Sequence, residues 1–240
     1  MLPKGLIKVG KGNMQTATTT QVIIAALNEE EGVGPTISEI KACLGSTKIT
    51  VVDGRSGDRT VQIAESMGAE IIVQDKKGKG DAFAKAIEHI DPDATYVILT
   101  DADFTYPAEY IPKMIEILKK NPLIGMVCGN RFTEELDSHA LHDLFYLGNR
   151  LIAFTHNLLN GVKLVDPLTG LRVVRAQVLR GWKIKSKGFD VEVELNHRVE
   201  REGFTIAEVP IKYRERLGVK KLKFEHGAEI LKRIMLETTY

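Results

Sequence analysis

Short runs of apolar and β-branched residues alternate along the chain with longer segments in which apolar residues recur every three or four positions. The short runs predict buried strands, and the longer segments predict amphipathic helices. The expected strands cover residues 22–27, 48–53, 69–74, 96–100, 124–128, 171–174 and 205–213. The expected helices cover residues 34–44, 58–67, 81–90, 108–120, 141–159, 191–202 and a last segment from Phe224. Strands and helices that alternate over short loops indicate an α/β fold with a doubly wound, mostly parallel sheet flanked by helices.

The same pattern suggests how the chain is organised. Residues 1–20 are polar and aperiodic, so we expect a flexible N-terminal arm. Residues 21–240 are numerous enough to bury one full core, and we expect a single domain. The regular order breaks after Arg131. Residues 132–240 are therefore expected to be an elaboration that closes over the half formed by residues 21–131.

Two carboxylates lie one residue apart directly after the apolar run of residues 96–100. This placement delivers Asp101 and Asp103 to the carboxyl end of a buried strand, and Pro107 stops any regular continuation. Hard oxygen ligands beside an open loop suit Mg²⁺ or Mn²⁺ carrying a diphosphate. Aspartates after strands also commonly make turns or cap the next helix. Taken alone, the pair leaves both interpretations open.

Other polar residues follow the ends of neighbouring strands. Asn28 and Glu29 follow the first strand, Asp53 ends the second, and the loop of residues 76–80 brings Lys79 after the third. Ligands of open parallel sheets bind beyond the carboxyl ends of the strands, so these residues form one candidate site with the carboxylate pair. Acceptors for a base, ribose or metal beside lysines for phosphate predict a nucleotide diphosphate site. The alternatives are an ordinary turn after Asp53 and a solvated run of lysines.

Composition and motifs exclude several other classes of function. A net charge of +1 gives no reason to expect nucleic acid as a partner. Cys43 and Cys128 lie far apart in apolar settings and are expected to be reduced, as in a cytoplasmic protein. We expect neither a signal peptide nor a membrane span, because no apolar run is long enough. The sequence also lacks the glycine fingerprint of dinucleotide sites, the P-loop and the hydrolase nucleophile elbow.

Several short motifs in a fixed order carry a resemblance to a known family. They cover residues 25–29, 52–60, 77–80, 101–103, 166–172 and 188–195. Together they resemble family 2 glycosyltransferases of the GT-A fold, and more narrowly the dolichol-phosphate mannose and glucose synthases. The resemblance extends from Gln21 to the end of the chain. It departs from the family where Ala25 and Leu27 replace proline and tyrosine, Gly54 replaces a second aspartate and Lys220 replaces serine.

The resemblance implies roles for individual residues. It implies that Mg²⁺ or Mn²⁺ is bound by Asp101, Asp103 and Thr105, with Asp103 as the direct ligand. The residues expected to bind the nucleotide-sugar are Ala25, Leu27, Glu29, Asp53, Lys79, Asp101, Ala102, Asp103 and Arg131. The residues expected to act in catalysis are Asp103, Arg131 and Arg216. The residues expected to bind the acceptor phosphate are Arg150, Arg216 and Lys221, the last in a loop with Gly218 and Leu222 that closes over both phosphates.

The charged residues in the second half of the chain indicate which class of acceptor the protein would use. A hydroxyl acceptor needs a carboxylate base, for which Asp166, Asp190, Glu192 and Glu194 are candidates. A phosphate monoester needs none, because it is largely dianionic at pH 7. It requires cations instead, and the available ones are Arg131, Arg150, Arg172, Arg216, Lys220 and Lys221.

We therefore expect an inverting, metal-dependent transfer of a hexose from a UDP- or GDP-sugar to a polyprenyl or dolichyl phosphate. The alternatives are a glycosyltransferase with a hydroxyl acceptor and a sugar-nucleotide binding protein without activity. Peripheral contact with the cytoplasmic face of a membrane is expected, through the helix of residues 141–159. Its candidate lipid contacts are Leu141, Leu144, Phe145, Leu151, Ile152 and Phe154, although a core or dimer helix explains the same pattern. The donor sugar and the oligomeric state stay open.

Overall fold

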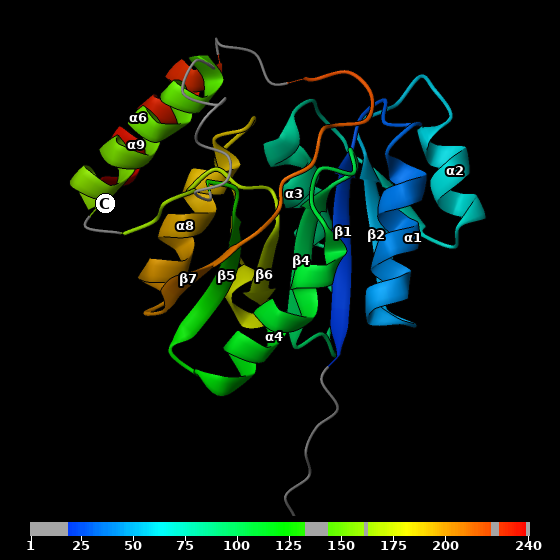
Figure 1. The fold of residues 1–240 in the computed structure, drawn as a ribbon, viewed down its shortest axis with the longest axis horizontal. Coiled ribbons are helices and arrows are strands. Elements are labelled where there is room, and N and C mark those ends of the chain that lie inside the picture. Colours follow the sequence, from blue (N-terminus) through cyan, green and yellow to red (C-terminus); the bar gives the residue numbers. More distant parts are fainter. Residues whose placement is uncertain (1–18, 133–143, 161–162, 222–225, 239–240) are drawn as a thin grey trace, which may run out of the picture.

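A single seven-stranded sheet forms the centre of the computed structural model, which describes residues 19–132, 144–160, 163–221 and 226–238 (Figure 1). The strand order is β3-β2-β1-β4-β6-β5-β7. The strands are β1 (Thr20–Ala26), β2 (Lys48–Asp53), β3 (Glu70–Val73), β4 (Tyr96–Asp101), β5 (Ile124–Asn130), β6 (Arg172–Arg175) and β7 (Thr205–Pro210). Strand β6 runs antiparallel to β4 and β5, and the other pairs are parallel. The predicted mixed, mostly parallel sheet is therefore confirmed.

Helices cover both faces of this sheet. They are α1 (Val33–Leu44), α2 (Thr60–Ser66), α3 (Lys79–Ile87), α4 (Ile111–Lys120), α6 (Leu144–Asn160), α7 (Ala176–Leu179), α8 (Val191–Arg201) and α9 (His226–Thr238), with a 3₁₀ turn η1 (Ala108–Tyr110) before α4. Successive residues of β1 point to opposite faces. Val22 and Ile24 lie in the core shared with α1 and α4, whereas Ile23 lies in the core shared with α3 and α8.

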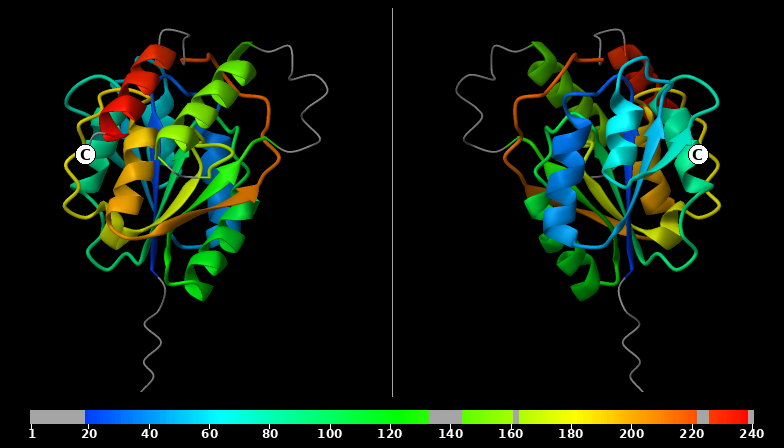
Figure 2. Two further views of the ribbon diagram at one scale, coloured as in Figure 1. Left: turned by 90° about the vertical axis from the view of Figure 1, so that its left-hand side faces the viewer. Right: turned by 90° about the vertical axis from the view of Figure 1, so that its right-hand side faces the viewer.

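Helices α6 and α9 form a further layer outside α8. They lie side by side in Figures 1 and 2, and Ile152 of α6 packs with Val193 of α8 and with Ile230 and Ile234 of α9. Ile152 is buried, so its prediction as a lipid contact is wrong. The amphipathic pattern of α6 reflects this buried seam. Leu141 lies outside the described residues, as do the side chains of Leu144 and Phe145.

Several predicted boundaries differ in the structure. Helix α3 begins at Lys79, so the expected lysine loop is shorter than predicted. Strand β7 ends at Pro210, and the backbone N–H of Ile211 makes a last bond to the Asn130 carbonyl before the chain leaves the sheet. The short helix α7 was not predicted. Of the expected N-terminal arm, residues 1–18 lie outside the described part of the chain, and Thr20 already belongs to β1.

The second half of the chain completes the sheet of the first. Strand β6 inserts between β4 and β5, and β7 extends the sheet beyond β5. One continuous sheet therefore carries both halves, and their division into a donor half and an acceptor half stays a prediction. None of the helices in the described residues is long and apolar enough to cross a membrane.

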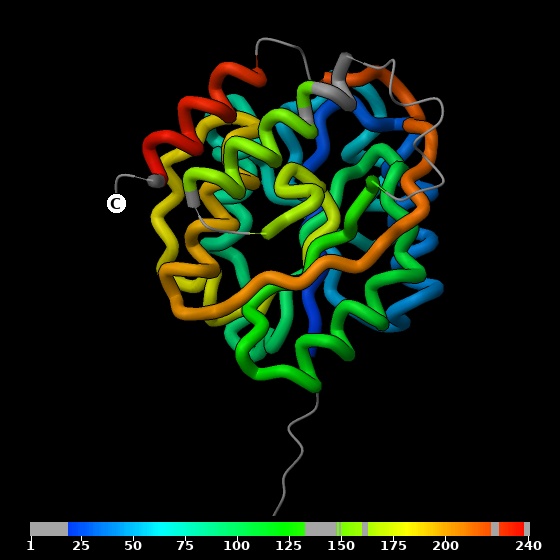
Figure 3. The backbone as a smooth tube through the Cα atoms, turned by 60° about the vertical axis from the view of Figure 1, so that its left-hand side comes forward, coloured from blue at the N-terminus to red at the C-terminus, as the bar shows by residue number. Residues whose placement is uncertain are grey.

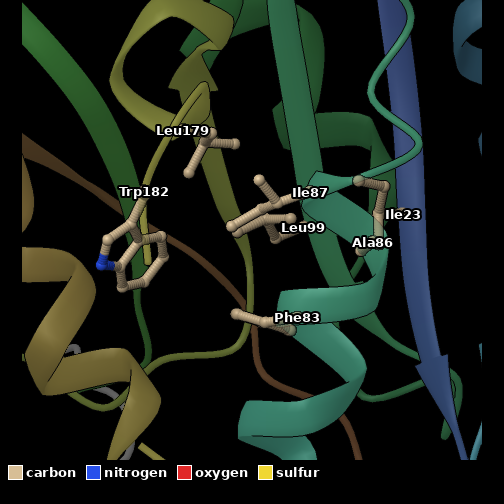
Figure 4. Close-up of a pocket in the computed structure, with 7 residues that line it drawn as sticks. All are labelled: Ile23, Phe83, Ala86, Ile87, Leu99, Leu179 and Trp182. Carbon is tan, nitrogen blue, oxygen red and sulfur yellow. The ribbon is translucent and has the colours of Figure 1, made fainter. Parts of the chain in front are cut away.

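A small void remains between α3 and the sheet (Figure 4). Its volume is about 10 Å³, and its walls include Phe83, Leu99 and Trp182. A single water needs roughly this much space, together with polar partners. The walls are almost wholly apolar. The void is a packing defect of the core and holds no ligand site.

Candidate active site

The carboxyl ends of β1, β2 and β4 bring the predicted aspartates to one edge of the sheet. In the strand register Ala26 of β1 lies opposite Asp53 of β2, and Ala25 lies opposite Asp101 of β4. Asp53 and Asp101 therefore flank β1 from either side. The expectation that these residues gather at one edge is confirmed.

Asp53 forms a turn at this edge. Its buried carboxylate accepts hydrogen bonds from the backbone N–H groups of Arg55 at 2.9 Å and Ser56 at 3.1 Å. The side-chain oxygen of Asn28 accepts a bond from the N–H of Gly57 at 2.8 Å. The loops after β1 and β2 are thereby joined, and Leu27 stays partly exposed beside Gly54.

Lys79 is held between two carboxylates. Its ammonium group lies 2.7 Å from Asp101 Oδ1 and 2.7 Å from Glu192 Oε1, and its side chain is only 10% exposed. The two negative charges raise the pKa of Lys79, against the opposing effect of burial. The other side of Asp101 leaves no room, because a Cβ atom on Gly170 would lie 2.3 Å from Asp101 Oδ2. Asp101 is thus fixed by the first turn of α3 and by Gly170.

Asp103 is a buried carboxylate held by Thr105 and by the guanidinium of Arg216. Its Oδ1 accepts bonds from the Thr105 hydroxyl at 2.6 Å and from the Thr105 N–H at 3.2 Å. Its Oδ2 lies 3.1 Å from the guanidinium of Arg216. Burial raises the pKa of Asp103, the charge of Asp101 raises it further, and Thr105 and Arg216 oppose that shift. Phe104, between them, has a backbone φ of 65°.

A segment after β7, which we name the strap (residues 211–221), lies over these carboxylates. Figures 1 and 3 show this orange segment running from β7 to the end of the sheet where β1 finishes. The N–H of Leu217 donates to the Asp103 carbonyl at 3.1 Å. Arg216 pairs with both Asp103 and Glu29. Lys221 lies 2.6 Å from Glu29 and donates to the Asn28 carbonyl at 2.7 Å.

Glu29 is the point where the strap meets the end of β1. Its carboxylate is buried, and burial raises its pKa while Lys221 and Arg216 oppose that shift. A groove of about 390 Å³ opens beside it, between the loop after β1 and the tip of the strap. The lining residues of this groove are Asn28, Glu29, Glu30, Glu31, Asp58, Gly218, Val219 and Lys221.

The predicted arginines divide into three environments. Arg131 has 15% of its side chain exposed and makes a bidentate pair with Asp166, with both contacts at 2.7 Å. Arg150 is exposed, and its guanidinium lies 5.9 Å from the ring of Phe132, which also faces Arg131 at 5.6 Å. Arg172 is fully buried in the core. The structure therefore brings Arg150 towards Arg131.

The prediction that Arg172 is available to an acceptor phosphate is wrong. Its guanidinium donates to the carbonyls of Thr169 and Pro167 and to the side chain of Asn196. These bonds tie the segment before β6 to α8. Arg172 is a structural residue of the core.

Each carboxylate proposed as a base already has a strong partner. Asp166 binds Arg131, and Asp190 lies 2.9 Å from Arg233. Glu194 accepts bonds from the backbone N–H groups of residues 185 and 186. Glu192 binds Lys79 through one oxygen, and its other oxygen is buried without a hydrogen-bond partner among the described residues.

The donor set suits a divalent ion that is held mainly by a substrate. Within the described residues no cluster of three or more metal-ligating side chains is present. Asp103 Oδ2 is a carboxylate oxygen whose charge is balanced by an arginine from another segment. Mg²⁺ characteristically takes one or two carboxylates together with substrate phosphates and water. The residues present fit an ion of that kind at Asp103.

One contact of the strap could not be found from the sequence. Arg214 pairs with Glu39 of α1, although the two are 175 residues apart. Both are charged residues in polar surroundings, which is the usual character of solvated positions. Neither belongs to a motif, so no local signal joins them.

The mixed sheet, the carboxylate pair after β4 and the basic strap over it agree with the GT-A fold that the sequence predicted. The family profile described as Glycosyl transferase family 2 matches residues 21–182. The chain belongs to this family. This confirms the resemblance on which the site was predicted.

The relatives agree with this assignment. The chain is 36% identical to "Dolichyl-phosphate hexose transferase" of Haloferax volcanii, over 89% of this chain and 91% of that protein. It is 26% identical to "Dolichol-phosphate mannosyltransferase" of Pyrococcus furiosus, over 89% of this chain but 62% of that protein. A solved structure of glucosyl-3-phosphoglycerate synthase from Mycobacterium tuberculosis, in complex with Mn²⁺, UDP-glucose and phosphoglyceric acid, shares the fold with a TM-score of 0.73 and 19% identity. That likeness covers 93% of this chain and 80% of the solved one.

Lys79→Met is expected to destabilise the fold. It leaves the buried Glu192 and the partly buried Asp101 close together without a positive charge, which costs on the order of 3 kcal/mol in the free energy of unfolding. Urea unfolding at pH 7 measures this, with the exposed Lys77→Met as the matched control. Equal stability of the two variants would contradict a structural role for the buried Lys79 pair.

Proposed function

We propose that this family 2 glycosyltransferase moves a hexose from a UDP- or GDP-sugar to a polyprenyl or dolichyl phosphate, with inversion at the anomeric carbon. The observation that carries the proposal is the convergence of strap cations on Glu29 and Asp103, beside carboxylates that are all already paired. Such a site offers cations that can exchange their carboxylate partners for phosphates. It is poor in a free base.

The donor would bind at the carboxyl edge of β1, β2 and β4. Asp103 would hold Mg²⁺ or Mn²⁺, with Asp101 behind it and Thr105 fixing the Asp103 carboxylate. The ion, when bound, supplies Lewis-acid stabilisation of the nucleotide diphosphate as it leaves. Arg216 would exchange its carboxylate partners for the diphosphate oxygens, for which a guanidinium is well shaped.

The acceptor would approach from the side of Arg150. A phosphate oxygen of the acceptor forms the new bond to the anomeric carbon, and the bond from that carbon to the diphosphate oxygen breaks. A dianionic phosphate monoester carries no proton that must be removed. The site would then bind it through Arg150, Arg216 and Lys221, with Arg131 held behind Phe132 by Asp166.

The two alternatives are a hydroxyl acceptor and a binding protein without activity, and each needs different properties of these residues. A hydroxyl acceptor needs a base, and Glu192 is the candidate with a free oxygen among the described residues. The solved structure with phosphoglyceric acid shares only the fold, so it does not favour this acceptor class. A binding protein without activity would keep the donor contacts and release no nucleotide diphosphate.

Turnover of a panel of donors tests the proposal. UDP-glucose, UDP-N-acetylglucosamine and GDP-mannose are incubated with Mn²⁺, with and without a short-chain polyprenyl phosphate, and lipid-linked sugar is measured. We expect product from one donor and only with the lipid phosphate. Asp103→Asn is expected to lower turnover by at least about a hundredfold, because it removes the carboxylate charge that would hold the ion, and the ion is what stabilises the leaving diphosphate. Asp93→Asn, at an exposed position, is the matched control.

Two outcomes would contradict the proposal. Nucleotide binding without any lipid product would favour a hydroxyl acceptor or a binding protein. Normal turnover in Asp103→Asn would show that the carboxylate pair is not the donor site.

We also propose that the layer of α6 and α9 contacts the cytoplasmic face of a membrane. Phe154 and Leu158 are 63% and 69% exposed, one helical turn apart on α6. Further exposed apolar residues of this layer are Leu151, Leu159, Met235 and Leu236. An apolar face of this kind suits the boundary between headgroups and acyl chains. It would place the site near a lipid-linked acceptor.

Vesicle binding tests the membrane contact. The double variant Phe154→Ser/Leu158→Ser is expected to sediment with phosphatidylcholine–phosphatidylglycerol vesicles at least about tenfold less than the wild type, because each lost apolar side chain weakens burial in lipid. Leu123→Ser, at an exposed position before β5, is the control. Unchanged sedimentation of the double variant would refute the contact. Loss of a dimer instead would assign the face to a second copy.

A further inference from the structure

Arg214 makes three contacts that join the strap to two distant parts of the chain. Its guanidinium forms a bidentate pair with Glu39 of α1, in which Nη1 donates to Oε2 at 3.0 Å. The same guanidinium lies 4.3 Å from the centre of the Phe104 ring. Its backbone N–H donates to the Thr105 carbonyl at 3.0 Å. One residue of the strap thus contacts both α1 and the loop that carries Asp103.

The contact with Phe104 falls on a strained position. Phe104 has a backbone φ of 65°, a conformation that aromatic residues rarely adopt and that its surroundings must hold. It lies directly between Asp103 and Thr105. The stacked guanidinium covers the ring and, through Glu39, fixes it against α1. Loss of this contact would therefore shift the backbone of Phe104 and, with it, the neighbouring carboxylate of Asp103.

The short distance along the strap from Arg214 to Arg216 limits where Arg216 can lie. Arg216 lies two residues after Arg214, and the N–H of Leu217 bonds to the Asp103 carbonyl. Beyond Leu217, Gly218 takes a φ of 76°, where the backbone turns. With Arg214 anchored, the short segment up to Gly218 and the pair with Glu29 decide where Arg216 meets Asp103.

We propose that Arg214, through Glu39 and Phe104, is a positioning residue that sets the distance between Asp103 and Arg216. The inference rests on the proposed function for its kinetic consequence, but the anchor itself is independent of any substrate. The side chains of Arg214 and Glu39 are 30% and 25% exposed, and exposed ion pairs usually contribute little to stability. The bidentate geometry and the stacking on the Phe104 ring strengthen this pair beyond an ordinary surface ion pair.

Amide hydrogen exchange of the free protein tests the anchor without donor, acceptor or metal. In Glu39→Gln, peptides covering residues 212–218 are expected to exchange roughly tenfold faster, because the N–H groups of Arg214 and Leu217 lose their fixed partners. The N–H of Ile211, which bonds to Asn130 in the sheet, is expected to stay protected. Glu202→Gln is the matched control, since Glu202 pairs with Arg198 at 2.8 Å on α8 at a similar exposure. Exchange in Glu39→Gln equal to that of Glu202→Gln would overturn the proposal.

Kinetics with the donor found active then test the consequence. Glu39→Gln and Phe104→Leu are expected to raise the Mn²⁺ concentration for half-maximal turnover about tenfold and to lower kcat, whereas Glu202→Gln is expected to change neither. Arg214→Lys is expected to lose less activity than these two variants. The lysine keeps the charge that pairs with Glu39, although it lacks the bidentate geometry and the stacking of arginine. Faster exchange with unchanged Mn²⁺ dependence would overturn the positioning role. If the wild type turns over no donor, the proposed function fails, and the exchange experiment still decides the anchor.

Discussion

Buried negative charge at the carboxyl edge of the sheet is the constraint on which the rest of this structure depends. Asp101, Asp103 and Glu29 all lie within or beside the ends of β1 and β4, where hydration is poor. A buried carboxylate that lacks a positive partner is strongly destabilising. Each therefore recruits a cation from a remote segment: Lys79 from α3, and Arg216 and Lys221 from the strap. The architecture around the site follows from these pairings.

The pairings differ in how readily they can be exchanged. Lys79 is enclosed by Asp101 and Glu192 and joins α3 to α8, so it behaves as part of the scaffold. Arg216 and Lys221 belong to a segment outside the sheet and are anchored near Arg214. A sugar-linked diphosphate would present the strap with two negative charges, as Glu29 and Asp103 now do, and a divalent ion on Asp103 would balance the charges that the diphosphate adds. The proposed donor site is thus balanced in charge both with and without its ligand.

The fold and the placement of the carboxylates could be predicted because they follow from local rules. Short continuous apolar runs mark the buried strands, and parallel topology brings Asp53 and Asp101 to one edge. Prediction failed where a tertiary contact overrides a local pattern. Ile152 belongs to a seam with α8 and α9 rather than to an outer face, and Arg172 satisfies carbonyls in the core. The pair between Arg214 and Glu39 lies beyond any local rule, because only the folded chain brings the two together.

A crystal structure with Mn²⁺ and either GDP or UDP would test the central claim most directly, with the ion located by its anomalous scattering. We expect the ion on Asp103 and the diphosphate oxygens on Arg216, with Lys79 still held between Asp101 and Glu192. An ion bound away from Asp103, or a nucleotide bound outside the edge formed by β1, β2 and β4, would contradict it.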